Sequence, residues 1–144
     1  MKKIFILFIY MIMLCFVVVG QNKTDFEKNG AIVNFQTTKL GEIVKNEIKL
    51  IKDMNVSGVF VFLPDKKSVV IRHQNGNDEL LKVNSKKVTH DNNYVFDCDK
   101  NRVLFISPTS RIITYSIAGK STLFLFPINI EDISTLKNVL LKYR

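Results

Sequence analysis

The sequence is poor in cysteine and histidine, with two residues of each type in 144. Cys15 lies in an apolar N-terminal run that we expect to be removed, which leaves Cys98 without a cysteine partner. An internal disulfide is therefore excluded, and the core alone must hold the fold. One cysteine and two scattered histidines also lack the close ligand pairs of a zinc site.

The same scarcity argues against catalysis. Cys98 could act as a nucleophile with His73 or His90 as its base, but no spacing identifies an orienting group or an oxyanion hole. Residues 118–122, Ala-Gly-Lys-Ser-Thr, look like the end of a phosphate-binding loop, but Thr114 occupies the position of its first glycine. We therefore expect no cofactor, and the sequence favours a protein that is not an enzyme without deciding the question.

Long runs of like charge are missing as well. The chain has 21 lysines and arginines against 13 acidic residues, a formal net charge of +8. Its lysines are scattered, and no stretch of five or six basic residues forms an arm. This pattern argues against nucleic acid as a partner, and we expect the partner to be an unidentified protein or envelope component.

What the sequence does contain is one uninterrupted apolar run, residues 4–19, which follows two lysines. A basic start, an apolar run and a small-residue exit are the parts of a secretory signal peptide. Val18 and Gly20 suit cleavage between Gly20 and Gln21. We therefore expect residues 1–20 to be removed and the protein to be exported, either to the periplasm or to the outside of the cell.

Two alternatives remain for this run. Residues 4–20 could persist as an uncleaved anchor, although a spanning helix needs about 20 apolar residues. Cys15 could instead carry a lipid, but Leu14 stands where a small residue is required. In each case we expect membrane contact to be limited to the N-terminal signal or anchor.

The rest of the chain divides into a polar tether, residues 21–29, and one domain, residues 30–144. Most of the domain shows short apolar segments separated by tight turns, and Asn75-Gly76 is the strongest hairpin signal. Two segments show a helical period instead. The apolar residues of the first, residues 39–54, are Leu40, Ile43, Val44, Ile48, Ile51 and Met54. Those of the second, which follows Asn129, are Ile133, Leu136, Leu140 and Tyr143.

The expected fold is therefore α+β. A mostly antiparallel, curled sheet of about seven to nine short strands should be packed by a helix at residues 39–54 and by a C-terminal helix. This arrangement is similar to a PH-like barrel capped by its last helix. A cystatin-like sheet wrapped on its first helix is the alternative. Both are analogies of fold and imply no function.

One segment carries a weak metal-binding pattern. Residues 97–101 match the first half of a calcium-binding EF-hand loop, which makes Asp97, Asp99 and Asn101 weak candidate ligands. However, Arg102 occupies the glycine position of that loop, and strands are expected on both sides. We favour a polar hairpin turn.

Three classes of function remain. We favour a small exported protein that works as a non-catalytic binding or accessory module through its sheet face or hairpin tips. The first alternative is a structural partner at the cell envelope, held by an uncleaved anchor and docked through an exposed edge strand. The second is a small hydrolase whose site the sequence does not reveal. A concave apolar pocket with converging polar groups would favour ligand binding.

Overall fold

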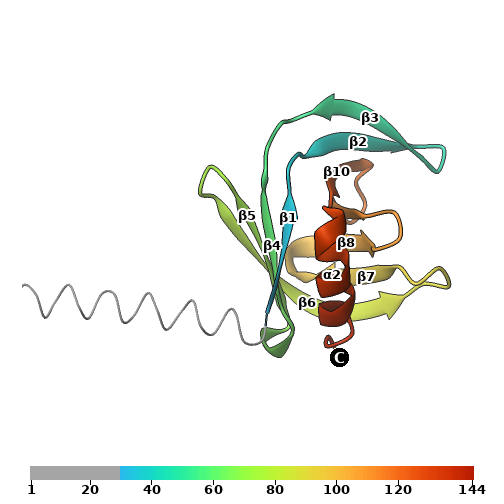
Figure 1. Cartoon of the computed structure of the whole chain (residues 1–144). Helices are drawn as coiled ribbons and strands as arrows, with labels where there is room; N and C mark the ends of the chain where they lie inside the picture. The colour runs from blue at the N-terminus through green and yellow to red at the C-terminus, as the bar shows by residue number, and fades with distance from the viewer. Residues whose placement is uncertain (1–29) are drawn as a thin grey trace, which may run out of the picture.

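One antiparallel sheet dominates the computed structural model, which describes residues 30–144 (Figure 1). Its ten strands are β1 (Ala31–Phe35), β2 (Lys39–Val44), β3 (Glu47–Asp53), β4 (Gly58–Leu63), β5 (Ser68–His73), β6 (Asp78–Val88), β7 (Tyr94–Cys98), β8 (Arg102–Ser107), β9 (Ile112–Ile117) and β10 (Thr122–Pro127). The helical elements are η1 (Pro64–Lys66), η2 (Asp99–Asn101), η3 (Ile130–Asp132) and α2 (Ile133–Leu140). The strand order is β1-β4-β5-β6-β7-β8-β9-β10-β2-β3. The predicted curled antiparallel sheet is confirmed, with ten strands where seven to nine were expected.

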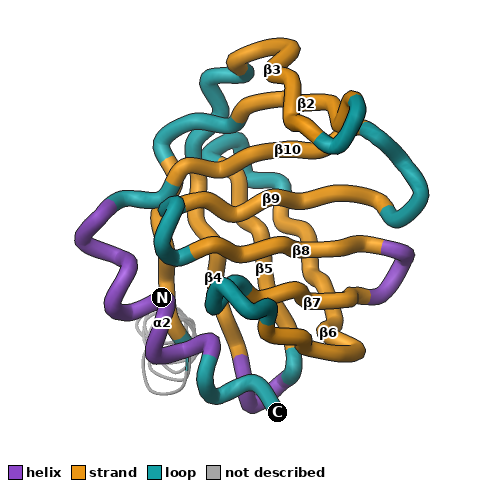
Figure 2. Tube along the Cα trace, turned by 90° about the vertical axis from the view of Figure 1, so that its right-hand side faces the viewer, coloured by secondary structure: helices purple, strands orange, loops and turns teal. Residues whose placement is uncertain are grey.

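β1 and β2 behave as one bent strand. β1 pairs with β4, whereas β2 pairs with β10. A bridge between Phe35 and Ile128 extends the β10–β2 ladder back to the end of β1. The sheet therefore curls until the end of β1 meets the chain just after β10. The β2–β3 hairpin continues the sheet beyond β10 (Figure 2).

The core fills the concave face of this curled sheet. Successive side chains of a strand point to opposite faces, so alternate residues of strands such as β1 and β7 are buried. At the centre, the rings of Phe35, Phe60 and Phe126 lie with centroids 4.8 to 5.3 Å apart. Burying a side chain of this size stabilises a fold by about 1.5–3 kcal/mol, so this cluster fastens β1, β4 and β10 together.

The predicted C-terminal helix is present as α2, which lies against β1 (Figure 1). Leu136, Val139 and Leu140 on its inner face are buried in the core. Beyond the helix, the buried Tyr143 hydroxyl donates to the Ser68 carbonyl oxygen at 2.6 Å. The helix and Tyr143 are therefore part of the core.

The start of this helical region differs from the expectation. Asn129 precedes η3, not α2, and its side chain makes no capping hydrogen bond. The carboxylate of Asp132, at the boundary between η3 and α2, instead accepts the backbone N–H of Asn34 at 2.8 Å. This bond fixes the helix entry to β1.

The helix predicted for residues 39–54 is wrong, because this segment is the β2–β3 hairpin. Lys45 and Asn46 form its two-residue turn with left-handed φ values of 50° and 66°. Turns of this kind match the twist of paired strands. The cystatin-like alternative required a helix here and is wrong for the same reason.

Two features explain why this segment forms strands and not a helix. Gly41 is a poor helix former, and a Cβ at this position would lie 2.9 Å from Cδ1 of Leu125 on β10. Ile43 and Ile48 are β-branched and sit opposite each other in the hairpin. The apolar residues that fitted a helical period occupy both faces of this hairpin, and most of them are exposed.

Candidate binding site

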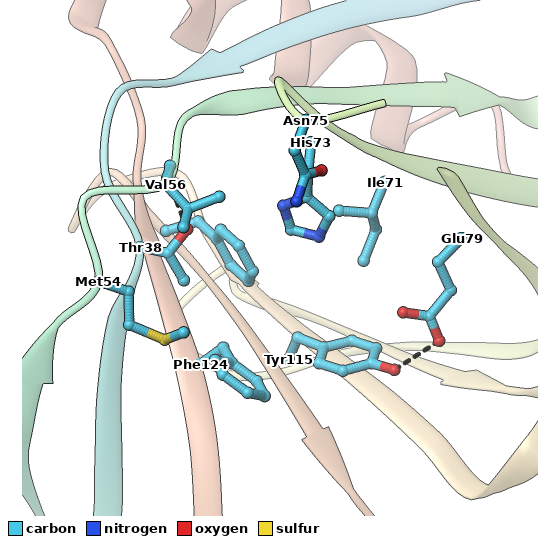
Figure 3. A pocket seen from close by; sticks show the side chains of 10 residues that line it. Thr38, Met54, Val56, Ile71, His73, Asn75, Glu79, Tyr115 and Phe124 are labelled. Carbon is cyan, nitrogen blue, oxygen red and sulfur yellow. Dashed lines mark hydrogen bonds between the residues drawn. The ribbon is translucent and has the colours of Figure 1, made fainter. Parts of the chain in front are cut away.

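A pocket of about 330 Å³ opens where the bent strands leave the rest of the sheet (Figure 3). We call it the mouth pocket. Its walls come from the β1–β2 link, the β3–β4 link, the β5–β6 hairpin, and strands β9 and β10. The lining residues are Thr38, Met54, Val56, Ile71, His73, Asn75, Glu79, Tyr115, Phe124 and Phe126.

Hydrogen bonds hold the bend in place on one side of the pocket. Met54 donates its backbone N–H to the Thr38 carbonyl oxygen at 2.8 Å. The Thr38 hydroxyl donates to the Val56 carbonyl oxygen at 2.9 Å. These two bonds tie the β1–β2 link to the β3–β4 link, so the wall does not depend on regular strand pairing.

The base of the pocket is apolar. Ile71 and Phe126 belong to the buried core, and Phe124 packs against it. The rings of Tyr115 and Phe124 lie with centroids 6.2 Å apart. A ligand that enters the pocket would therefore meet mainly aliphatic and aromatic side chains.

One side of the pocket is polar. The Tyr115 hydroxyl donates to Glu79 Oε1 at 2.7 Å, and Arg102 Nε lies 3.6 Å from the same oxygen. The Arg102 guanidinium also lies 5.5 Å from the centroid of the Tyr115 ring. Burial, followed by the hydrogen bond to Glu79, raises the pKa of Tyr115 above its ordinary value. Tyr115 therefore keeps its proton at neutral pH and holds the Glu79 carboxylate at the rim.

His73 supplies a second polar group. Its ring faces the cavity in Figure 3 and meets the ring of Phe35 edge-on at 6.0 Å. His73 Nδ1 is buried and has no hydrogen-bond partner among residues 30–144. Buried polar atoms are nearly always hydrogen-bonded in folded proteins, so this nitrogen is suited to a hydrogen bond from a bound molecule.

The sequence does hold a signal for this site, although no catalytic motif marks it. His73, Glu79 and Arg102 each continue the inward-facing alternation of a strand, in phase with core residues such as Ile71, Leu81 and Leu104. A charged or polar residue in the inward phase is expected to face a cavity or a partner. Bringing these three together, however, depends on strand order, which the alternation does not give.

The candidate catalytic residues are not gathered here. Cys98 is buried on β7 and does not line the pocket. Burial, with the negative charges of Asp99 and Asp97, raises the pKa of its thiol to about 12. His90 is exposed and lies 3.5 Å from Asp91. Residues 30–144 contain no group of three or more histidine, cysteine or acidic side chains that could hold a metal ion.

The three candidate metal ligands lie at the end of β7 and in the turn η2 that leads into β8. Asp97 is exposed on β7, and Asp99 Oδ1 accepts the backbone N–H of Lys82 at 3.0 Å. Asn101, like Lys100 before it, has a left-handed φ near 57° in the turn. This geometry fits the polar hairpin that we favoured, and the metal site stays a prediction.

The N-terminal predictions lie outside the described residues. They comprise the signal peptide of residues 1–20, the cleavage between Gly20 and Gln21, the alternative anchor of residues 4–20, and the tether of residues 21–29. From residue 30 onward, no helix has both the length and the apolar character needed to cross a membrane.

Comparisons with protein families, with curated proteins and with solved structures found no match to this chain.

Proposed function

We propose that residues 30–144 form a non-catalytic binding module and that the mouth pocket is its ligand site. The observation that supports this most is the convergence of His73, Glu79 and Tyr115 on one cavity whose base is apolar. Small-molecule sites typically combine a concave apolar surface with a few convergent polar groups.

The pocket defines the chemistry of its ligand. A volume of about 330 Å³ lies at the small end of ligand cavities, so the ligand should be about the size of one substituted ring or a short branched chain. Its body should be apolar, to match Ile71, Phe124 and Phe126. It should carry a hydroxyl or amine group that can hydrogen-bond to His73 Nδ1 or to the Glu79 carboxylate.

The same groups support binding over catalysis. Tyr115 has a raised pKa, and Glu79 is already engaged by Tyr115 and Arg102. Nucleophilic catalysis requires an activated nucleophile beside its base. The mouth pocket offers His73 as a base without such a nucleophile in its lining.

A fragment titration followed by NMR of the backbone amides tests this function. p-Cresol and toluene make a suitable pair, because they share a ring and a methyl group and differ by one hydroxyl. We expect p-cresol to shift amide signals of residues 54–57, 71–79 and 115, and toluene to bind more weakly. If both compounds shift signals equally across the whole domain, or shift none, the pocket is not a ligand site.

A matched pair of variants locates the binding. Val56→Phe places a ring into the pocket, whereas Val88→Phe makes the same change at an exposed position on β6. We expect Val56→Phe to weaken p-cresol binding by about tenfold or more, corresponding to at least ~1.4 kcal/mol. Val88→Phe should leave binding unchanged. Equal affinities for the two variants would contradict the proposed site.

We further propose that this module acts after export, in the periplasm or outside the cell. The support is the signal-like pattern of residues 1–20. The alternative, a structural partner at the envelope, is supported by the open edge of β3. A hydrolase would need a reacting group beside His73 that the pocket lining does not supply.

A further inference from the structure

The β2–β3 hairpin carries an unusual share of the exposed apolar surface. Every residue of β3 is exposed, and β3 is the last strand of the sheet. Six of the eleven large apolar side chains exposed on the described domain lie between residues 43 and 54. Concentrated exposed apolar surface usually marks an interaction site.

Three of these side chains share one face of the hairpin. Ile43 lies opposite Ile48, and Leu50 lies opposite Gly41, so Ile43, Ile48 and Leu50 point to the same side. A Cβ on Gly41 would meet both Ile48 and Leu123 within 3.4 Å. The face therefore continues onto β10, away from the core cluster.

The backbone of Ile48 is directed toward the open edge. Ile43 donates its N–H to the Ser121 carbonyl oxygen at 2.8 Å, on the side of β2 that faces away from β3. In an antiparallel ladder, opposite residues turn their backbone groups either toward each other or away from each other. Ile48, opposite Ile43, therefore turns its N–H and carbonyl groups outward, where no strand of residues 30–144 pairs with them.

The charges beside Ile48 are self-complementary. Glu47 and Lys49 flank it on one face of β3. If two β3 strands pair antiparallel with Ile48 opposite Ile48, Glu47 of each copy lies opposite Lys49 of the other. Opposite charges placed directly across an antiparallel pair stabilise it, whereas like charges destabilise it. An edge lysine normally discourages strand addition, but in this register each Lys49 lies opposite a Glu47 of the other copy.

The neighbouring register is less favourable. Centring the pair on Leu50 would place Glu47 opposite Asp53 and Ile48 opposite Lys52. The β2–β3 ladder also shifts register between Leu40 and Gly41, which leaves Ile51 as an extra residue on β3. The bulge interrupts the edge after Leu50, so the usable stretch is Glu47–Leu50.

We propose that two copies of this chain pair antiparallel through the Glu47–Lys49 edge of β3, with Ile48 opposite Ile48. The pairing joins the apolar faces of the two hairpins into one surface on the same side of the combined sheet. Because each copy uses this edge once around a two-fold axis, the assembly closes as a dimer. This surface is separate from the mouth pocket, and the proposal does not depend on ligand binding.

Charge reversal tests the register. Glu47→Lys and Lys49→Glu each place like charges across the pair, so each variant of the full chain should be monomeric in sedimentation velocity. An equimolar mixture of the two should dimerise again, because every cross-strand pair then joins opposite charges. The double variant Glu47→Lys/Lys49→Glu should restore the homodimer. Glu131→Lys and Lys137→Glu, at exposed positions on η3 and α2, are the matched controls and should behave as the unaltered chain.

A register-specific crosslink provides a second measurement. Ile48→Cys should form a disulfide-linked dimer under mild oxidation, because directly paired residues lie within the range that a disulfide spans. Val88→Cys, equally exposed on β6, should not. The proposal is wrong if the unaltered chain stays monomeric at all concentrations, if both single charge variants dimerise unchanged, or if the crosslink forms equally at residue 88.

Discussion

Tyr115 on β9 donates its hydroxyl to Glu79 on β6 at 2.7 Å, across the concave face of the curled sheet. Two strands, β7 and β8, separate them in the sheet. The bond therefore connects elements that the backbone ladders do not join directly. It holds the mouth pocket at the width that the structure shows.

Replacing Tyr115 by phenylalanine should loosen this connection. A hydrogen bond to a charged group contributes about 1.5–3 kcal/mol, and the half-buried position of Glu79 favours the lower end. We expect Tyr115→Phe to reduce the free energy of unfolding by about 1–2 kcal/mol in urea titrations. Tyr94→Phe removes the same atom from β7 without breaking this contact, and an equal loss there would contradict the assignment.

The stability of the domain should fall in alkaline solution. Burial is the largest cause that raises the pKa of Cys98, Tyr115 and Tyr143. Together with the charges of Asp99 and Asp97, it raises the pKa of Cys98 from 9.0 to about 12. These groups are protonated in both folded and unfolded chains below pH 9. Above that pH the unfolded chain loses protons first, so folding becomes less favourable as pH rises. We expect the melting temperature to decrease steadily from pH 9 to pH 12.

Two variants identify the groups responsible. Cys98→Ala and Tyr143→Phe should each make the alkaline decrease in melting temperature less steep. At neutral pH, Cys98→Ala should cost about 1 kcal/mol, the usual scale of a single substitution, because Cys98 is a free cysteine whose thiol makes only a long contact, 3.8 Å, to the Phe96 carbonyl oxygen. If the melting temperature of both variants falls with pH as steeply as that of the unaltered chain, groups other than Cys98 and Tyr143 cause the alkaline loss of stability.

Adjacent leucines at the end of α2 provide a strict test of its role in the core. Leu140 is fully buried, whereas Leu141 is 69% exposed. Leu140→Asp would place an unpaired charge inside the core and should unfold the domain. Leu141→Asp should change the free energy of unfolding by less than about 0.5 kcal/mol. Circular dichroism in the near ultraviolet would report both outcomes, and a folded Leu140→Asp variant would mean that the helix is dispensable.

The predicted start of the exported protein is Gln21. Signal-directed cleavage after Gly20 should remove residues 1–20. Intact-mass measurement of protein collected outside the cytoplasm would reveal the shorter chain. A full-length species extracted from membranes would instead favour the anchor at residues 4–20.

Alternation and turn residues predicted much of the sheet. The segments 94–98 and 102–107 are strands, as the short apolar segments between tight turns predicted, and Gly76 adopts the positive φ that its hairpin signal implied. These predictions succeeded because local sequence fixes them. A residue in a strand alternates between the core and solvent, and a tight turn needs residues that tolerate positive φ.

The same reasoning gave a wrong prediction for the β2–β3 hairpin, because the apolar residues of this hairpin are not buried in the core. Ile43 and Ile48 are about half exposed, on a hairpin that extends beyond the closure of the sheet. A period inferred from such residues reflects exposed side chains, not burial. The mouth pocket could not be predicted either, because it unites residues as distant as Thr38 and Phe126 through the bend.

The closure of the sheet by β2 and β10 also constrains when the protein can fold. Leu125 must pair with Lys39, and Leu136 follows later still in the chain and lies fully in the core. During synthesis, β2 emerges long before its partner, while the hairpins from β4 to β10 can pair locally as they appear. Pairings with such long sequence separation are slow to form. A chain that lacks β10 or α2 therefore cannot close its core, although its earlier hairpins can already be paired.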